Sequence, residues 1–167
     1  MNDKKVRKLI YAAMLAALVV VATMVVKIPS PTNGYVNLGD CFVLLAGWLL
    51  GPWYGAAAAG VGSMLTDLLS GYAYYAPASF LIKGLDAMVA ALLYRTLKRS
   101  RGGLLLSGMV GELLMTAGYF AYSALLLGKG LAAALSIPGN LVQGAVGIVA
   151  AILLLHLAQR AHLTEKM

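Results

Sequence analysis

Charge is scarce in this chain of 167 residues, in which Asp, Glu, Lys and Arg together make up only 11% of the sequence. Hydrophobic residues make up 61%, and the mean hydropathy is +0.84. A soluble domain of this size needs far more polar surface to stay dispersed. We therefore predict a protein embedded in a lipid bilayer, with residues 1–167 forming a single integral membrane domain.

Cysteine and histidine are also scarce, and this disfavours several kinds of site. The single cysteine, Cys41, excludes an internal disulfide and is expected to be a packing residue. No Cys/His spacing resembles a zinc site, and His156 and His162 have no HExxH or catalytic-serine context. The chain has no GxxxxGK[ST] sequence for ATP. We expect no enzyme activity, no metal and no cofactor bound for catalysis.

What the chain does have is six apolar segments, separated by turn-forming residues or charge clusters. They cover residues 9–26, 36–50, 55–69, 77–94, 104–127 and 140–157. A straight crossing of about 30 Å of hydrocarbon takes about 20 residues, so the second and third segments are short. We predict an all-α membrane protein with a six-transmembrane-helix bundle over residues 9–157. A single re-entrant hairpin formed by the two short segments is the alternative.

Basic residues indicate the orientation of this bundle. Of the thirteen Lys and Arg residues, ten fall before the first segment, between the fourth and fifth, or after the sixth. The positive-inside rule places these stretches in the cytoplasm, including a basic N-terminus over residues 1–8 and a tail over residues 158–167. Because the basic residues cluster at the ends of apolar runs, they indicate membrane topology and no nucleic-acid partner.

Four of the charged residues within the apolar segments are the first candidates for a functional site. Asp67, Lys83, Asp86 and Glu112 all lie within predicted helices. A charge at the bilayer centre costs about 2.5–3.5 kcal/mol on insertion scales, so such residues face a bundle interior or an aqueous cavity. Lys83 is three residues from Asp86 and is expected to pair with it, or with Asp67 across the bundle. Glu112 lies deeper, and a purely structural role is its alternative.

Aromatic residues gather in the predicted outer connection over residues 71–77. Tyr72, Tyr74 and Tyr75 lie there beside the mouth of the expected cavity, and residues 29–35 form a second connection on the same side. Tyrosine stacks on flat rings and donates a hydrogen bond at low entropic cost, which suits a small heteroaromatic solute. An aromatic belt at the lipid interface is the alternative for one or two of them.

The chain resembles the substrate-binding S components of energy-coupling factor (ECF) transporters, in their riboflavin-type, vitamin-uptake branch. The likeness lies in residues 8–18, with the small-xxx-small pairs Ala12/Ala16 and Ala13/Ala17, and in residues 36–40, 62–72 and 76–85. It implies a multi-pass protein of a prokaryotic cell membrane that captures a vitamin or precursor from outside. It also implies a transmembrane coupling subunit, docked on Ala12, Ala13, Ala16 and Ala17, and two cytoplasmic ATPase subunits that alone bind ATP.

The same resemblance nominates substrate-binding residues in the outer loops and the last three helices. Those nominated are Lys83, Asp86, Tyr72, Tyr74, Tyr75, Tyr119, Asn140 and Gln143, with Asp67 and Asn37 as second choices. Lys83 is expected to meet an anionic or carbonyl group, and Asp86 is expected to orient Lys83 or to accept a hydrogen bond from a ring nitrogen of the solute. Flavin, pyridoxine and a thiamine precursor all stay open as solutes. A stand-alone proton-coupled carrier or channel is the alternative function, because Asp67, Asp86 and Glu112 can relay protons.

Overall fold

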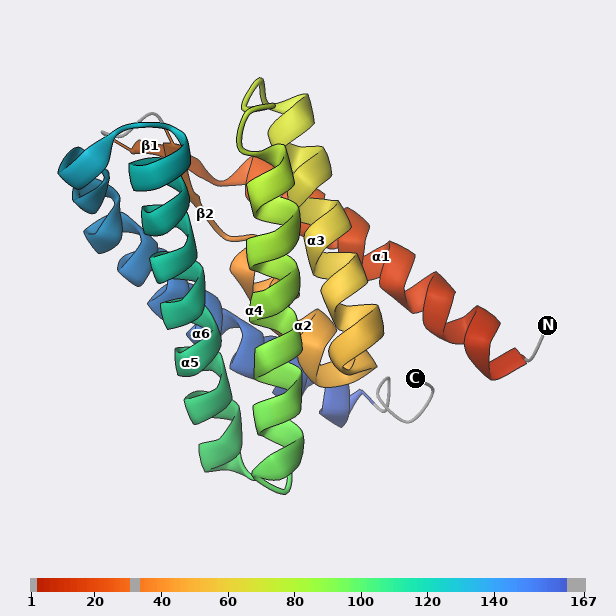
Figure 1. The fold of residues 1–167 in the computed structure, drawn as a ribbon. Helices are drawn as coiled ribbons and strands as arrows, with labels where there is room; N and C mark the ends of the chain where they lie inside the picture. Colours follow the sequence, from red (N-terminus) through yellow and green to blue (C-terminus); the bar gives the residue numbers. More distant parts are fainter. Residues whose placement is uncertain (1–2, 31–33, 162–167) are drawn as a thin grey trace.

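The computed structural model describes residues 3–30 and 34–161, and this part of the chain is mostly helical (Figure 1). The ends of the predicted N-terminus and tail, including His162 and Lys166, lie outside it. The α-helices are α1 (Asp3–Val25), α2 (Asp40–Leu50), α3 (Pro52–Leu69), α4 (Ala76–Thr96), α5 (Arg101–Ala121) and α6 (Ile137–Arg160). Each of the six predicted segments overlaps one of these helices.

The connection between α1 and α2 is a small antiparallel sheet, which the all-α prediction missed. Strand β1 (Lys27–Ser30) pairs with β2 (Gly34–Asn37), and Lys27 lies opposite Asn37. The predicted second segment, residues 36–50, therefore begins in a strand and becomes helical only at Asp40. The hairpin brings the start of α2 back to the end of α1.

A tight turn at Gly51 separates α2 from α3. Gly51 has a φ of 83°, in the left-handed region that glycine tolerates, and a Cβ there would lie 2.3 Å from Nη2 of Arg95. Pro52 then starts α3, at a position where its missing N–H costs no helical hydrogen bond. A single residue, Gly51, thus separates the two helices.

The end of α5 is irregular. A π-helical turn, η1 (Tyr122–Leu126), continues α5, and a 3₁₀ helix, η2 (Gly130–Ser136), leads into α6. Two glycines, Gly128 and Gly130, adopt positive φ between them. Wide helical turns of this kind are frequent at functional sites. In Figure 1 this segment, the β-hairpin and the α3–α4 connection gather at one end of the bundle, with the α4–α5 turn at the other.

The core lies where α2 packs against α3, α4 and α6. Leu44 and Trp48 of α2, Tyr94 of α4 and Ile148 of α6 belong to one buried cluster. Nε1 of Trp48 donates to Oγ of Ser107 at 3.1 Å, which satisfies the one polar atom of the indole. Cys41 is buried in the same cluster, as expected of a packing residue.

Four helical stretches in the described part of the chain are long and apolar enough to cross a membrane. They are Lys5–Val25, Ala76–Thr96, Arg101–Leu126 and Gly130–Arg160. Helix α2 is apolar but only 11 residues long, or about 16 Å at 1.5 Å per residue. The crossings of α2 and α3, and the cytoplasmic position of both termini, stay predictions.

Candidate functional site

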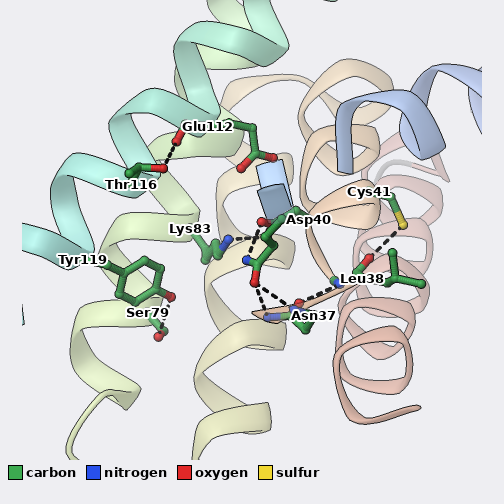
Figure 2. A network of polar contacts seen from close by, with 11 residues as sticks. Asn37, Leu38, Asp40, Cys41, Ser79, Lys83, Glu112, Thr116 and Tyr119 are labelled. Atoms are coloured by element: carbon green, nitrogen blue, oxygen red, sulfur yellow. Dashed lines mark hydrogen bonds and ion pairs between the residues drawn. The ribbon is translucent and has the colours of Figure 1, made fainter. Parts of the chain in front are cut away.

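The centre of the bundle holds an ion pair between α4 and α2. Lys83 Nζ contacts Asp40 Oδ1, and the two residues are only 4% and 1% exposed (Figure 2). The sequence predicted Asp86 or Asp67 as the partner of Lys83, and the structure pairs it with Asp40 instead. Asp40 lies in the first turn of α2, where the partial positive charge of a helix N-terminus favours a carboxylate.

Gln143 of α6 connects this ion pair to the β-hairpin. Its Nε2 donates to Asp40 Oδ2 at 2.6 Å, and its Oε1 accepts from the backbone N and Nδ2 of Asn37 at 2.8 and 3.2 Å. Asn37 Oδ1 in turn accepts from the backbone N of Gly39 at 2.7 Å. Asn37, Gln143, Asp40 and Lys83 thus form a continuous polar chain from the β-hairpin into the bundle interior. We call these four residues the polar chain.

Tyr119 of α5 extends the site from the polar chain toward the hairpin end of the bundle. Lys83 Nζ lies 5.7 Å from the centre of its ring, and its hydroxyl is 2.7 Å from Oγ of Ser79 on α4. A cation at this distance is attracted to the electron-rich face of the ring. Figure 2 shows Tyr119 and Ser79 on the same side of Lys83.

The three predicted loop tyrosines form an aromatic cluster with Tyr119 and Tyr122. Neighbouring ring centres lie 4.9 Å apart for Tyr74 and Tyr75, 5.6 Å for Tyr75 and Tyr122, and 6.2 Å for Tyr75 and Tyr119. Tyr72 joins through Tyr74 at 6.2 Å, and Lys27 lies over its ring at 5.1 Å. Partial burial, with a smaller contribution from the neighbouring tyrosines, raises the pKa of Tyr74, so it stays a neutral phenol.

Hydrogen bonds attach this aromatic cluster to the irregular end of α5. The Tyr75 hydroxyl lies 2.9 Å from Ser123 Oγ and accepts from Lys129 Nζ at 3.3 Å. The Tyr122 hydroxyl donates to the backbone carbonyl of Tyr74. The α3–α4 connection and η1 therefore form one cover at the hairpin end of the bundle.

Asp86 and Glu112 are buried beside the polar chain. They are 0% and 5% exposed. Neither carboxyl oxygen of Asp86 has a hydrogen-bond partner in the described part of the chain, whereas Glu112 contacts the carboxyl group of Asp40. Both act electrostatically on Lys83, together with Asp40. Figure 2 shows Glu112 close to the Asp40–Lys83 pair, although the sequence placed it too deep for this cluster.

The other nominated residues lie around this centre. Asp67 is 4% exposed near the end of α3, and Asn140 is half-buried one turn before Gln143. Of the four alanines nominated for docking, Ala12 is buried in the core, Ala16 is half-buried, and Ala13 and Ala17 are exposed. The described part of the chain has no group of three or more His, Cys, Asp or Glu arranged to hold a metal ion.

The sequence analysis missed Asp40, Ser123 and Lys129 as parts of this network. Asp40 lies 43 residues before Lys83, and no helical periodicity relates two residues so far apart. The available signal was the position of Asp40, a carboxylate directly before an apolar run. Lys129 lies between the fifth and sixth apolar segments, and the sequence predicted no contact for it.

Comparisons with known proteins now identify the family. The sequence model of the family described as "ECF-type riboflavin transporter, S component" matches residues 3–160. The chain belongs to this family. It is therefore the substrate-binding component of an ECF transporter for uptake of a vitamin or vitamin precursor, and a multi-pass membrane protein. The family is a transporter component and not an enzyme.

Two relatives and two solved structures are similar to this chain. This S component is 32% identical over 163 residues to the thiamine precursor transporter HmpT of Lactococcus lactis subsp. cremoris (strain MG1363), covering 96% and 92% of the two chains. It is 36% identical over 132 residues to a Pyrococcus woesei protein described only by its place in the gap 3′ region, covering 78% and 87%. The S component of a bacterial ECF transporter has a TM-score of 0.68 at 25% identity, covering 94% and 98%. The biotin S component has a TM-score of 0.71 at 20% identity, covering 95% and 94%, and supports the fold alone.

Proposed function

We propose that this S component captures a flat, heteroaromatic vitamin or precursor from the non-cytoplasmic side, within the space bounded by the polar chain and the aromatic cluster. The observation that carries the proposal is the polar chain itself. It places an ion pair and two amide side chains in the interior of a bundle whose surroundings are apolar. Riboflavin and a thiamine precursor are the solutes named for the family and for HmpT, and both classes fit this description.

The orientation follows from the basic residues. The hairpin, the tyrosines and η1 lie at one end of the bundle, whereas Arg95, Arg99 and Arg101 lie at the α4–α5 turn. The positive-inside rule places that turn in the cytoplasm and the aromatic cover outside. We infer six crossings of a prokaryotic cell membrane with both termini in the cytoplasm, in which the short helices α2 and α3 cross as a pair.

Energy for uptake comes from partners in this proposal. Two cytoplasmic ATPases bind and hydrolyse ATP, and the S component docks through α1 on a transmembrane coupling subunit. One face of α1 is exposed. It carries Ala13 and Ala17 together with four larger apolar residues that are between 40% and 55% exposed, Leu9, Ile10, Met14 and Leu18. Small residues in such a face allow close and reversible helix packing.

The test has two stages, capture and transport. Mass spectrometry identifies the compound that copurifies with the detergent-solubilised protein, and this compound is titrated into the wild type and Lys83→Ala. We expect Lys83→Ala to weaken binding by more than about tenfold, or roughly 1.4 kcal/mol. Uptake should require the coupling subunit and the ATPases. Uptake without them that a protonophore abolishes would instead indicate a stand-alone carrier.

A further inference from the structure

Among the residues that the structure describes, buried carboxyl groups outnumber the one buried cation, Lys83. Three carboxyl groups, those of Asp40, Asp86 and Glu112, lie at the junction of α2, α4, α5 and α6, each no more than 5% exposed. Asp40 is paired with Lys83 and also accepts from Gln143. Neither oxygen of Asp86 has a hydrogen-bond partner in the described part of the chain, and the group that the Glu112 carboxyl contacts is itself an acid, Asp40. The positive charge of Lys83 is therefore already matched, and two acidic groups are left over.

Glycines on the neighbouring helices leave space for these three side chains. A Cβ at Gly111 of α5 would lie 2.3 Å from Asp86 Oδ1, and one at Gly144 of α6 would lie 2.8 Å from Glu112 Cβ. At Gly147 a Cβ would lie 2.8 Å from Asp40 Cβ and 3.4 Å from Glu112 Oε1. Each carboxyl side chain thus packs where a neighbouring helix lacks a side chain. The bundle is shaped to contain these acids.

Other charges do not compensate for the excess. Lys27 and Lys129 lie at the aromatic cover, over the rings of Tyr72 and Tyr75. The remaining polar neighbours, Ser79 and Tyr119, are engaged with each other. Burying a carboxylate without a donor is costly, and the cost falls when a donor or a positive charge arrives. What the interior lacks is hydrogen-bond donors.

We propose that Asp86 and Glu112 are the specificity-determining carboxyls of the capture site, and that the captured solute presents N–H donors bearing positive charge to them. The inference rests on the proposed function and adds a substrate class to it. A flat cation with two parallel N–H groups binds a carboxylate in the bidentate manner of a guanidinium, and the tyrosine rings attract the same charge. An anionic solute finds no unmatched cation here.

The test uses three small probes of one shape. Benzamidinium, benzamide and benzoate share a phenyl ring and a trigonal head group but carry charges of +1, 0 and −1. Their binding to the detergent-solubilised protein is measured by saturation-transfer NMR and by competition with the copurified compound. We expect benzamidinium to bind at least about tenfold more tightly than benzamide, with benzoate weaker still.

Variants assign the preference to the two carboxyls. Asp86→Asn and Glu112→Gln keep the side-chain volume and remove the acid, singly and together, and each should reduce the preference for benzamidinium. Asp3→Asn removes the same charge from an exposed position of α1 and should leave the preference unchanged. The single variants keep the test valid if the double variant does not fold.

Three results would overturn the proposal. These are equal binding of benzamide and benzamidinium, a preference that survives in both single variants, and no binding of any probe. If a vitamin binds the wild type and both single variants within about twofold, the capture function stands and the role of the carboxyls is refuted. If neither a copurified compound nor any vitamin binds the wild type, the capture function itself is wrong.

Discussion

Gln143 of α6 and Asn37 of the hairpin are joined by two hydrogen bonds, although 106 residues separate them in the sequence. The same amide group of Gln143 donates to Asp40, which holds Lys83. A change at the ion pair can therefore affect the β-hairpin through the side chain of Gln143. This gives the site a physical connection between its interior and the segment that covers it.

Gln143→Leu tests this connection. It removes the acceptor of the Asn37 backbone N–H and one donor to Asp40, and an unsatisfied buried group costs about 1–3 kcal/mol. We expect lower thermal stability, faster hydrogen exchange over residues 34–40, and faster dissociation of the solute. Gln159→Leu is the matched control, because Gln159 is exposed on the same helix. Unchanged exchange over residues 34–40 in a folded Gln143→Leu protein would contradict the connection.

A second prediction concerns the ion pair as a unit. Lys83→Met leaves Asp40 buried without its cation, and breaking a buried pair costs about 3–5 kcal/mol. Replacing Asp40 as well, in Lys83→Met/Asp40→Asn, removes the uncompensated charge and should recover more than half of the lost stability. Thermal unfolding in one detergent compares the wild type, Lys83→Met, Asp40→Asn and the double variant. If the stability losses of the two single variants add up in the double variant, the two residues do not stabilise each other.

The two tryptophans provide a third prediction about the core. Trp48 is 6% exposed and donates to Ser107, whereas Trp53 is 76% exposed. Trp48→Phe loses a buried hydrogen bond and ring volume, and we expect a loss of about 1–3 kcal/mol in the free energy of unfolding. Trp53→Phe should change stability by less than about 0.5 kcal/mol. A larger effect at Trp53 would contradict the packing of α2 described above.

Local sequence patterns predicted the helices well and the contacts between them poorly. The apolar runs and the break at Gly51-Pro52 are local signals, and the helices follow them closely. The hairpin was missed because residues 27–37 are rich in Pro, Ser and Gly, which favour irregular connections. Whether such a short stretch forms paired strands depends on its contacts with the rest of the fold. Here the contact is a hydrogen bond from Asn37 to Gln143.

The partner of Lys83 shows the same limit in the site. Spacing along one helix suggested Asp86, three residues away, but Asp40 reaches the ammonium from α2. Which of several acids pairs with a lysine depends on how helices cross, and helical periodicity carries no information on crossing. The glycines facing Asp86 and Glu112 show the same limit. Their role in making room for an acid is visible only when the positions of α5 and α6 are known.

The last prediction concerns docking through α1. Ala13 and Ala17 are exposed, whereas Ala12 is buried against the core, so bulky residues at these positions should have different effects. Ala13→Trp and Ala17→Trp fill the outer face of α1 and should block close packing with a coupling subunit. We expect ATP-dependent uptake to fall by at least about tenfold while the solute dissociation constant changes by less than about twofold.

Two further variants distinguish a loss of docking from a loss of folding and from the effect of adding a large side chain elsewhere on the surface. Leu153→Trp adds a tryptophan on the exposed surface of α6, where Leu153 is 60% exposed, and should leave both uptake and binding unchanged. Ala12→Trp places the same bulk inside the core and should lower stability and binding together, because overpacking a close-packed interior strains its neighbours. If Ala13→Trp and Ala17→Trp transport as well as Leu153→Trp does, the coupling subunit meets another face of the bundle. Loss of solute binding in the Ala13 and Ala17 variants would show instead that α1 shapes the capture site.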